Sequence, residues 1–419
     1  MMKDNEVTMT MQRPLEGIRV LDLTVALAGP YGSLLLAGLG AEVIRVESPD
    51  GGDIARTNPP HVGKNGIHYG APEEGDVSLT ILNRARNKKS VTLNLKSPEG
   101  RRLFLELAKQ ADVVIENMSE GATMRLGVAY EDVAKVNPRI VYASIKAFGE
   151  PSIYPGLKGM DVLAQALSGI MDVTGFKDGP PTRFGLPIAD LLAPLYACNG
   201  ILAALIQRGR TGQGQHIQVS MLDCLASLVA EEHFDVSQAA GYPVRSGNSQ
   251  DRLVPFGVYP TRDGHAAIAG FNPVWFRGLL EAMGRQELLD DPRFASRGPR
   301  MKHADELNAL IEDWTSGYAT VDLLAELGSR GVPSVPVRTA VEVLNDPRLR
   351  ERGAVVELEH PSLGKIGATG MGLPIHFSAC KVGFDQPAMD LGAANAAVFG
   401  ALLGASDSQL AEWKQSGVI

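Results

Sequence analysis

The chain has 419 residues, of which 44% are hydrophobic and 21% are charged, a composition typical of an ordinary globular protein. A chain of this length exceeds the usual size of one domain, so we expect two domains, or one domain with a large insertion. Forty basic and 48 acidic residues give a net charge of −8, which disfavours broad binding to nucleic acid or to anionic membranes.

The N-terminal stretch and the cysteines indicate a compartment. Residues 1–13 are polar and of mixed charge, without the apolar centre of a signal peptide. No uncharged apolar run reaches about 18 residues, so no membrane span is expected. Cys198, Cys224 and Cys380 stand singly, which predicts buried, reduced thiols. We therefore expect a cytoplasmic protein.

The first half of the sequence alternates short apolar runs with helical periodicity. Strands are predicted at residues 18–23, 42–46, 113–115 and 140–144, and helices at 31–39, 98–110, 119–126, 130–136, 161–171 and 191–208. Short buried strands separated by such helices are typical of a parallel sheet covered on both faces. This pattern predicts a doubly wound α/β large domain over residues 14–230.

The composition changes after a predicted helix at 221–230. Residues 241–270 are rich in Gly, Pro and Asn, and they contain a predicted hairpin, 256–260 and 265–269, joined by 261–264. Helices are predicted at 273–283, 304–315 and 320–328. We therefore predict a small α/β domain over residues 231–337, followed by a C-terminal segment, 338–419, with two closing helical stretches.

Asp190 stands between a turn-rich stretch, 179–185, and a long apolar run that continues to Ala204. A carboxylate that opens an apolar helix can be stabilised by free backbone N–H groups and by the positive end of the helix dipole. It can also act as a nucleophile toward an acyl group where water is excluded. From this stretch alone the ordinary interpretation is a helix N-cap.

Several motifs, in order along the chain, carry a resemblance to a known family. They are Pro14 to Leu23, Ala28-Gly29-Pro30, Gly38 to Glu47, Asn87 to Ser90, Leu93 to Lys96, Asp112 to Asn117, Gly175-Phe176, Gly179-Pro180-Pro181, Gly212 to Val219 and Gly247-Asn248. From about residue 14 to its C-terminus the chain resembles the family III CoA-transferases, the group of formyl-CoA transferase, carnitine CoA-transferase and the related α-methylacyl-CoA racemases. The resemblance implies that Asp190 is the catalytic aspartate. It further implies a Rossmann-like CoA-binding large domain, a C-terminal segment that returns to it, and an interlocked homodimer.

The resemblance also implies positions that contact coenzyme A. These are Leu27, Ala28, Leu93, Lys96, Asn117, Ala122, Arg125 and Lys158. An acyl-CoA presents an apolar arm and several phosphate groups, so its site needs an apolar slot and a few basic donors. The basic run at 83–89 is a further candidate. Each of the three basic residues by itself is more typical of a solvated surface charge, and its place in a family motif gives the CoA contact equal weight.

A second group of positions stands where the family carries a mobile active-site loop. This group comprises Gly247, Asn248, Gln250 and Arg252, and it lacks the glycine run of formyl-CoA transferase. Gln250 and Arg252 are candidates to face the acceptor acid, and Arg252 favours a dicarboxylic acid. Leu27 replaces a glutamine of the formyl-CoA enzyme, so the oxyanion donors are expected among backbone N–H groups near Ala28.

These features predict transfer of CoA from an acyl-CoA thioester to a small carboxylic, possibly dicarboxylic, acid. The expected intermediates at Asp190 are a mixed anhydride and an aspartyl-CoA thioester, which survive only where water is excluded. Acyl-CoA and CoA act as substrates, and no permanently bound cofactor is expected. No metal site is expected either, since His61 and His68 are the nearest approach to a ligand pair.

Three alternatives stay open. The first lies within the family and is an acyl-CoA racemase or epimerase, or an intramolecular CoA-transfer isomerase. The racemases carry a His before the acid of a Gly-His-Asp motif, whereas this chain has Met160 before Asp161, and a thioether cannot accept a proton. From another class, Gly29 and Gly32 after a strand suggest a nucleotide-dependent dehydrogenase, but the full GxGxxG pattern is absent. A non-catalytic CoA-binding protein is the third.

Overall fold

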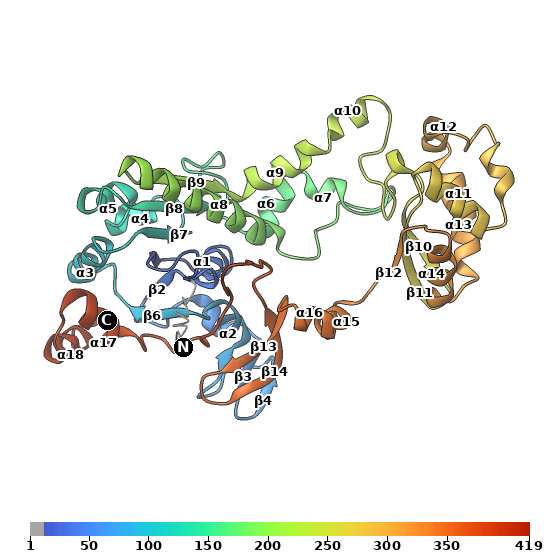
Figure 1. Ribbon diagram of the computed structural model, residues 1–419. Helices are drawn as coiled ribbons and strands as arrows, with labels where there is room; N and C mark the ends of the chain where they lie inside the picture. Colours follow the sequence, from blue (N-terminus) through green and yellow to red (C-terminus); the bar gives the residue numbers. More distant parts are fainter. Residues whose placement is uncertain (1–11) are drawn as a thin grey trace, which may run out of the picture. The chain divides into compact units, whose positions relative to one another are not determined.

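A computed structural model describes residues 12–419, which form two compact units (Figure 1). The first unit contains residues 12–168, 185–228 and 346–419, and the second contains residues 169–184 and 229–345. The sequence predicts boundaries after residues 230 and 337, and the structure places them after residues 228 and 345. It also assigns the short segment 169–184 to the second unit. Hydrophobic periodicity reports local structure, so it cannot predict that this segment packs with residues much later in the chain.

A six-stranded parallel sheet forms the centre of the first unit. Its strands lie in the order β6-β2-β1-β7-β8-β9, and every neighbouring pair is parallel. They are β6 (Lys88–Thr92), β2 (Glu42–Glu47), β1 (Arg19–Asp22), β7 (Val113–Glu116), β8 (Val141–Lys146) and β9 (Gln215–Ser220). The prediction of a parallel sheet is confirmed. The direction of winding reverses between β1 and β7, and in open α/β sheets ligands bind at the carboxyl ends of the strands at this point.

Helices cover both faces of this sheet because alternate strand residues point to opposite sides. On one face, Leu21, Ile44 and Val114 belong to a buried cluster that also contains side chains of α3 and of the C-terminal helices. On the other face, Ile115 packs against Gly32 in α1, and Ile217 packs against Gly200 in α8. The helices of this unit include α1 (Ala28–Gly38), α2 (Leu79–Arg84), α3 (Pro98–Ala108), α4 (Ala122–Leu126), α5 (Tyr130–Val136), α6 (Asp161–Leu167) and α8 (Ile188–Thr211).

The C-terminal segment completes the first unit. The Asn94 N–H donates to the Val418 carbonyl (2.8 Å), and the Ala394 N–H donates to the Ser90 carbonyl (2.9 Å), so the end of the chain lies along β6. The segment contains α16 (Pro347–Glu351), β13 (Val355–His360), β14 (Gly364–Met371), α17 (Asn395–Leu403) and α18 (Asp407–Gln415). A small sheet of β3 (His61–Gly63), β4 (Gly66–His68) and β5 (Val77–Ser78), together with the 3-10 turn Ile54–Thr57, precedes α2.

The second unit has its own three-stranded sheet and its own hydrophobic core. The predicted hairpin is present as β10 (Phe256–Thr261) and β11 (Gly264–Ala269), to which β12 (Ser334–Pro336) adds an antiparallel strand. Its helices are α7 (Ile170–Val173), α10 (Phe234–Ala239), α11 (Pro273–Ala282), α12 (Arg297–Lys302), α13 (Ala304–Ser316), α14 (Thr320–Ser329) and α15 (Ala340–Leu344). Helix α9 (Met221–Glu231) runs from the first unit into the second.

Two predicted helices differ in extent from the observed ones. The helix predicted at 161–171 is interrupted because Gly169 has a φ of +85°, a left-handed conformation that ends α6 before α7 begins. The helix predicted at 119–126 contains only the five residues of α4. A left-handed Gly121 precedes that short helix.

Helix α8 is the one helix in the described part of the chain that is long and apolar enough to cross a membrane. The criterion concerns length and composition alone, and the core helix of a globular fold also meets it. Here α8 buries Ala193, Ala197 and Ile201 on one face, and it packs against α1, β8 and β9. Helix α8 is therefore one of the helices that pack on the sheet of the first unit.

Candidate active site

Asp190 lies in the first turn of α8, and a second acid holds the backbone of that turn. Asp161, the first residue of α6, accepts hydrogen bonds through Oδ1 from the N–H groups of Ala189 (2.8 Å) and Asp190 (3.4 Å). The fully buried Gln165 donates from Nε2 to Asp161 Oδ2 at 2.6 Å. Asp161 thus satisfies the N–H groups that an N-cap usually binds, and the N-cap interpretation of Asp190 is wrong.

The environment of Asp190 makes its carboxylate basic. Burial raises its pKa most, the negative charge of Asp161 raises it further, and the positive charge of Arg84 lowers it, with a result of about 6. The carboxylate is partly exposed, and among residues 12–419 no group donates a hydrogen bond to it. A carboxylate that is ionised at neutral pH yet weakly stabilised is suited to nucleophilic attack.

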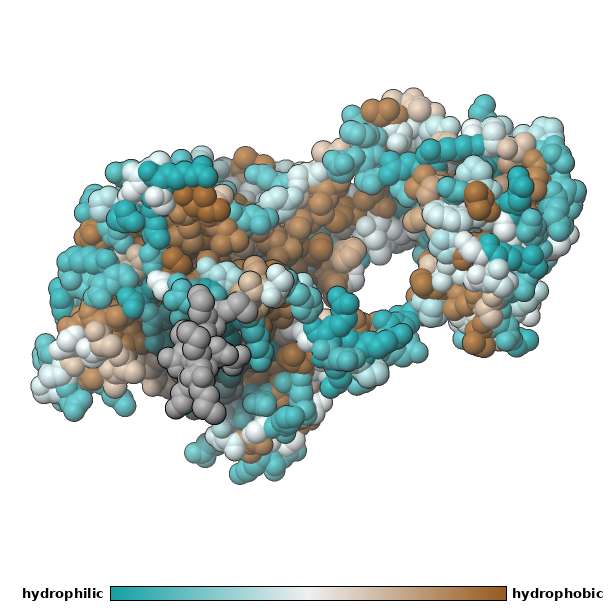
Figure 2. All heavy atoms as spheres, in the orientation of Figure 1, coloured by the Kyte–Doolittle hydropathy of each residue, from teal (hydrophilic) through white to brown (hydrophobic). Residues whose placement is uncertain are grey.

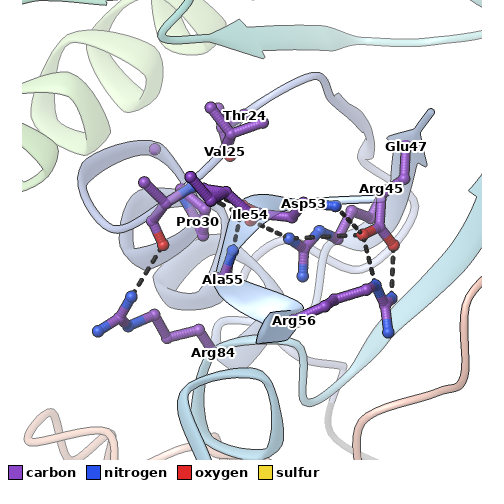
Figure 3. A network of polar contacts seen from close by, with 12 residues as sticks. Thr24, Val25, Pro30, Arg45, Glu47, Asp53, Ile54, Ala55, Arg56 and Arg84 are labelled. Atoms are coloured by element: carbon purple, nitrogen blue, oxygen red, sulfur yellow. Dashed lines mark hydrogen bonds and ion pairs between the residues drawn. The ribbon is translucent and has the colours of Figure 1, made fainter. Parts of the chain in front are cut away.

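Arg84 ends α2 and holds the loop that joins β1 to α1. Its Nη1 donates to the carbonyl of Ala26 at 2.8 Å, while Asp53 accepts the Ala26 N–H at 2.9 Å and 3.1 Å (Figure 3). Ala26 has a left-handed φ of +64°, an uncommon conformation for a residue with a Cβ. The two polar contacts fix this turn directly before α1.

A network of buried charges holds Asp53 in its turn. Asp53 forms an ion pair with Arg45, and its side chain accepts the Ala55 N–H at 2.9 Å (Figure 3). Arg56 donates to both oxygens of Glu47, at 2.9 Å and 2.7 Å. These charges are hydrogen-bonded to one another, so we interpret them as support for the loop.

Asn117 joins the two strands between which the winding reverses. Its Oδ1 accepts the Val25 N–H and its Nδ2 donates to the Val25 carbonyl, both at 2.9 Å. Val25 follows β1 and Asn117 follows β7, so the contact bridges the carboxyl ends of the two central strands. The predicted CoA-contacting residue Asn117 therefore lies where the fold provides a binding crevice.

A second buried network lies under the first turns of α1. Lys88 is almost completely buried, and its Nζ donates to Asp22 Oδ2 (3.1 Å), the Pro30 carbonyl (2.8 Å) and Ser33 Oγ (2.7 Å). Burial lowers the pKa of Lys88 to about 8, and the charge of Asp22 opposes that shift. These contacts place the start of α1 above β1 and β6.

The remaining predicted CoA-contacting residues also follow the carboxyl ends of strands in the first unit. Leu27 and Ala28 follow β1, Leu93 and Lys96 follow β6, Ala122 and Arg125 follow β7, and Lys158 follows β8. Carboxyl ends of parallel strands meet at one edge of a sheet, so the four connections that carry these seven residues all begin at that edge. The three basic side chains are exposed, whereas Leu93 lies in the core, where only its backbone can meet a ligand.

The predicted loop residues belong to the second unit. Gly247 has a φ of +64°, and its N–H donates to the Gly175 carbonyl at 2.9 Å. The Asn248 carbonyl accepts the Val258 N–H at 2.9 Å. Arg252 forms an ion pair with Glu232 (2.6 Å), and Gln250, with its amide reoriented, accepts from Arg252 at 3.0 Å. Arg252 therefore already has a carboxylate partner.

Sequence analysis missed Arg84, Asp161 and Gln165 as neighbours of Asp190. Arg84 was noted only as a member of a basic run, and Asp161 only as the residue after Met160. Met160 is exposed at the start of α6. The one pattern that could have linked Asp161 to Gln165 is their spacing, because residues four apart share a helix face.

Among residues 12–419, no group of three or more His, Cys, Asp or Glu side chains is placed to hold a metal ion.

Comparisons with known proteins identify the family to which the chain belongs. A family model described as CoA-transferase family III matches residues 15–395. The succinate–glutarate CoA-transferase of Agrobacterium fabrum is 35% identical over 390 residues, covering 93% of this chain and 96% of that protein. The succinyl-CoA:mesaconate CoA-transferase of Haloarcula marismortui is 38% identical over 351 residues, covering 83% and 86%.

A solved structure gives the same result at the level of the fold. The crystal structure of a CAIB/BAIF family protein from Brucella suis superposes with a TM-score of 0.79 at 36% identity, covering 93% of this chain and all of that one. The similarity thus extends over both units of the chain. The chain belongs to CoA-transferase family III, and it is an enzyme of that class.

Proposed function

We propose that this CoA-transferase exchanges CoA between two small dicarboxylic acids, with Asp190 as the nucleophile. The observation that carries the proposal is the Asp190 carboxylate, which is ionised at neutral pH and free of hydrogen-bond donors within the described residues. The two relatives described above are named for succinate, glutarate and mesaconate, which are all dicarboxylic acids.

The reaction proceeds through two covalent states of Asp190. Its carboxylate attacks the thioester carbonyl, the C–S bond breaks, and CoA leaves as the thiolate while an acyl-aspartyl anhydride forms. The thiolate then attacks the carbonyl of Asp190, which releases the first acid as its carboxylate and leaves a β-aspartyl-CoA thioester. The acceptor carboxylate reverses these steps. Each step conserves the energy of the thioester, which hydrolysis would discard.

The first turn of α1 is suited to stabilise the oxyanions of these steps. No side chain of residues 12–419 caps α1, so the N–H groups of Ala28 and Gly29 stay available for a ligand. Gly29 has no side chain because a Cβ there would lie 2.3 Å from Thr24 Cβ. These donors replace the side-chain amide that Leu27 cannot supply.

Mass spectrometry tests the proposed reaction. The purified enzyme is incubated with succinyl-CoA and a panel of mono- and dicarboxylic acids in D₂O, and the CoA products are identified. We expect new dicarboxylyl-CoA thioesters without deuterium at the α-carbon. Deuterium incorporation without transfer to any acid would favour a racemase, and CoA hydrolysis alone would exclude a transferase.

The pKa of Asp190 predicts a pH dependence for transfer. The ionised form attacks, so kcat/KM for the acyl-CoA should be constant above pH about 6 and should fall about tenfold per unit below it. Asp161→Asn keeps an oxygen for the N–H groups of α8 but removes the charge that raises the pKa of Asp190. We expect the acid limb of the variant's profile to move to lower pH. An acid limb that stays at the same pH in the variant would show that Asp190 is not the group whose ionisation controls the reaction.

We also propose that the protein is a homodimer with interlocked chains, as the family resemblance implies. The first unit exposes large apolar side chains on α6, α8 and α9, where Figure 2 shows brown surface. These side chains, which we call the apolar face, are Val162, Leu167, Leu195, Tyr196, Ile206 and Leu228. Contiguous apolar surface of this kind marks protein–protein contacts.

Analytical ultracentrifugation tests this assembly. Interlocked chains cannot separate without unfolding, so we expect a dimer down to nanomolar protein. Ile206→Glu places a charge on the apolar face and should lower the yield of folded dimer. Val274→Glu, at an exposed apolar residue of α11 in the second unit, is the control. A folded monomer at micromolar concentration would contradict the proposal.

A further inference from the structure

Arg84 combines three properties that the mechanism so far does not use. It is partly buried, it is anchored to the loop before α1 through Ala26 (2.8 Å), and its charge acts on both Asp190 and Asp53. The Ala26 carbonyl occupies one N–H of the guanidinium, which carries five. Within the described part of the chain, no carboxylate lies within 4.0 Å of it.

The other buried cations at this edge of the sheet already have partners. Arg45 forms an ion pair with Asp53, Arg56 with Glu47 (2.7 Å), and Lys146 with Glu116 (2.9 Å). Burial lowers the pKa of Arg84 most, and the charges of Asp190 and Asp53 oppose that shift although neither carboxylate forms an ion pair with it. A half-desolvated guanidinium with free donors is a recognition group for an anion.

Packing brings Arg84 and Asp190 to the same corner of the first unit. Arg84 contacts the loop that leads directly into α1, and α1 packs along α8. At that contact, a Cβ on Gly32 would meet Pro194 Cβ at 3.4 Å, one turn beyond Asp190. Arg84 and Asp190 therefore lie at the same corner of the first unit, and no ion pair within 4.0 Å joins them.

We propose that Arg84 binds the non-reacting carboxylate of the dicarboxylic substrate while the reacting carboxylate meets Asp190. This inference rests on the proposed function. The planar guanidinium offers paired N–H groups to a carboxylate, and its separation from Asp190 leaves room for a short carbon chain. Arg84 thereby selects diacids over monoacids. The sequence analysis attributed the preference for a dicarboxylic acid to Arg252, but Arg252 pairs with Glu232 instead.

Two five-carbon acids that differ only in the second carboxylate, glutarate and valerate, test the proposal. In a ping-pong reaction, kcat/KM for the acceptor reports only the half-reaction in which that acid enters. We expect Arg84→Gln to lower kcat/KM for glutarate by about 100-fold, mainly through KM, since truncating one partner of a buried charge pair is costly. For valerate we expect a much smaller fall, of at most about tenfold, because this acid loses the effect of Arg84 on the loop and on Asp190 but no contact of its own.

Further variants separate recognition from structure. Arg84→Lys should give an intermediate preference for glutarate, because the charge stays while the paired donors are lost. If Arg84→Gln does not fold, the Arg84→Lys variant tests the role of Arg84 in its place. Arg102→Gln, at an exposed arginine of α3 that pairs with Glu99, is the matched control and should leave both acids unaffected.

The outcomes distinguish this inference from the function on which it rests. An equal fall for glutarate and valerate in the Arg84 variants would overturn the inference, since a disturbed loop affects both acids alike. Wild-type enzyme that transfers CoA to no acid would instead overturn the proposed function. Unchanged glutarate kinetics in Arg84→Gln would show that the second carboxylate binds elsewhere.

Discussion

Asp190→Ala should lower CoA transfer by at least about 10⁴-fold, because no other group in the proposed mechanism can form the anhydride. Borohydride added during turnover of the wild-type enzyme should reduce the aspartyl thioester and change the mass of the peptide that contains Asp190. The same peptide of the variant should stay unmodified. Transfer assays and peptide mass spectrometry together measure both effects.

Two controls accompany this result. Asp223→Ala removes an exposed acid from the first turn of the next long helix, α9, and should retain wild-type turnover. Asp190→Asn should unfold at a higher temperature than the wild type at pH 8. The raised pKa of Asp190 means that its ionised form opposes folding above pH about 6, and an amide removes that charge. Wild-type turnover in Asp190→Ala would refute the covalent mechanism.

Lys88→Ala should destabilise the protein by about 3–5 kcal/mol, since it leaves the carboxylate of Asp22 buried without its cation. Asp22 is fully buried, and among the described residues its carboxylate keeps hydrogen bonds only from Ser33 and Thr24 once the ammonium is lost. The start of α1 should loosen as well, because Lys88 also binds the Pro30 carbonyl. Urea unfolding followed by circular dichroism measures the loss.

The next residue in the sequence provides a matched control. Lys89 is exposed and forms an ion pair with Glu42 at 2.5 Å, so Lys89→Ala should cost less than about 1 kcal/mol. Both substitutions remove one lysine from the same strand, and they differ mainly in burial. Similar unfolding midpoints for the two variants would show that the Lys88 network contributes little to stability.

Strands β1, β2, β7 and β8 of the large sheet were predictable because each is a short, largely buried run rich in apolar residues, whereas β6 and β9 are rich in charged or polar residues and were not predicted from periodicity. The runs at residues 18–23 and 42–46 correspond to β1 and β2, and those at 113–115 and 140–144 to β7 and β8. Strands β3, β4 and β5 were not predicted, since they contain few residues and depend on pairing with one another. Hairpin β13–β14 was missed because its outward residues are charged or small.

The residues that surround Asp190 were harder to predict from the sequence. Asp161 binds an N–H group 28 residues away, and Arg84 meets a carbonyl 58 residues away. Such contacts depend on how helices pack, and local periodicity contains no record of them. For Leu93 the sequence motif was misleading. It suggested contact with a ligand, but the Leu93 side chain is part of the buried core.

The division of the first unit into three stretches has a consequence for biosynthesis. Everything that the second unit needs has left the ribosome once residue 345 is exposed, whereas the first unit still lacks residues 346–419. Until then Ser90 of β6 and Asn94 just beyond it lack the backbone partners that Ala394 and Val418 supply. The apolar side chains of β6 and α3 also lack their cover from Phe399 and Trp413. Domains fold as units during synthesis. The nascent first unit, although it begins at the N-terminus, should therefore be the last to become resistant to proteases and the principal client of chaperones.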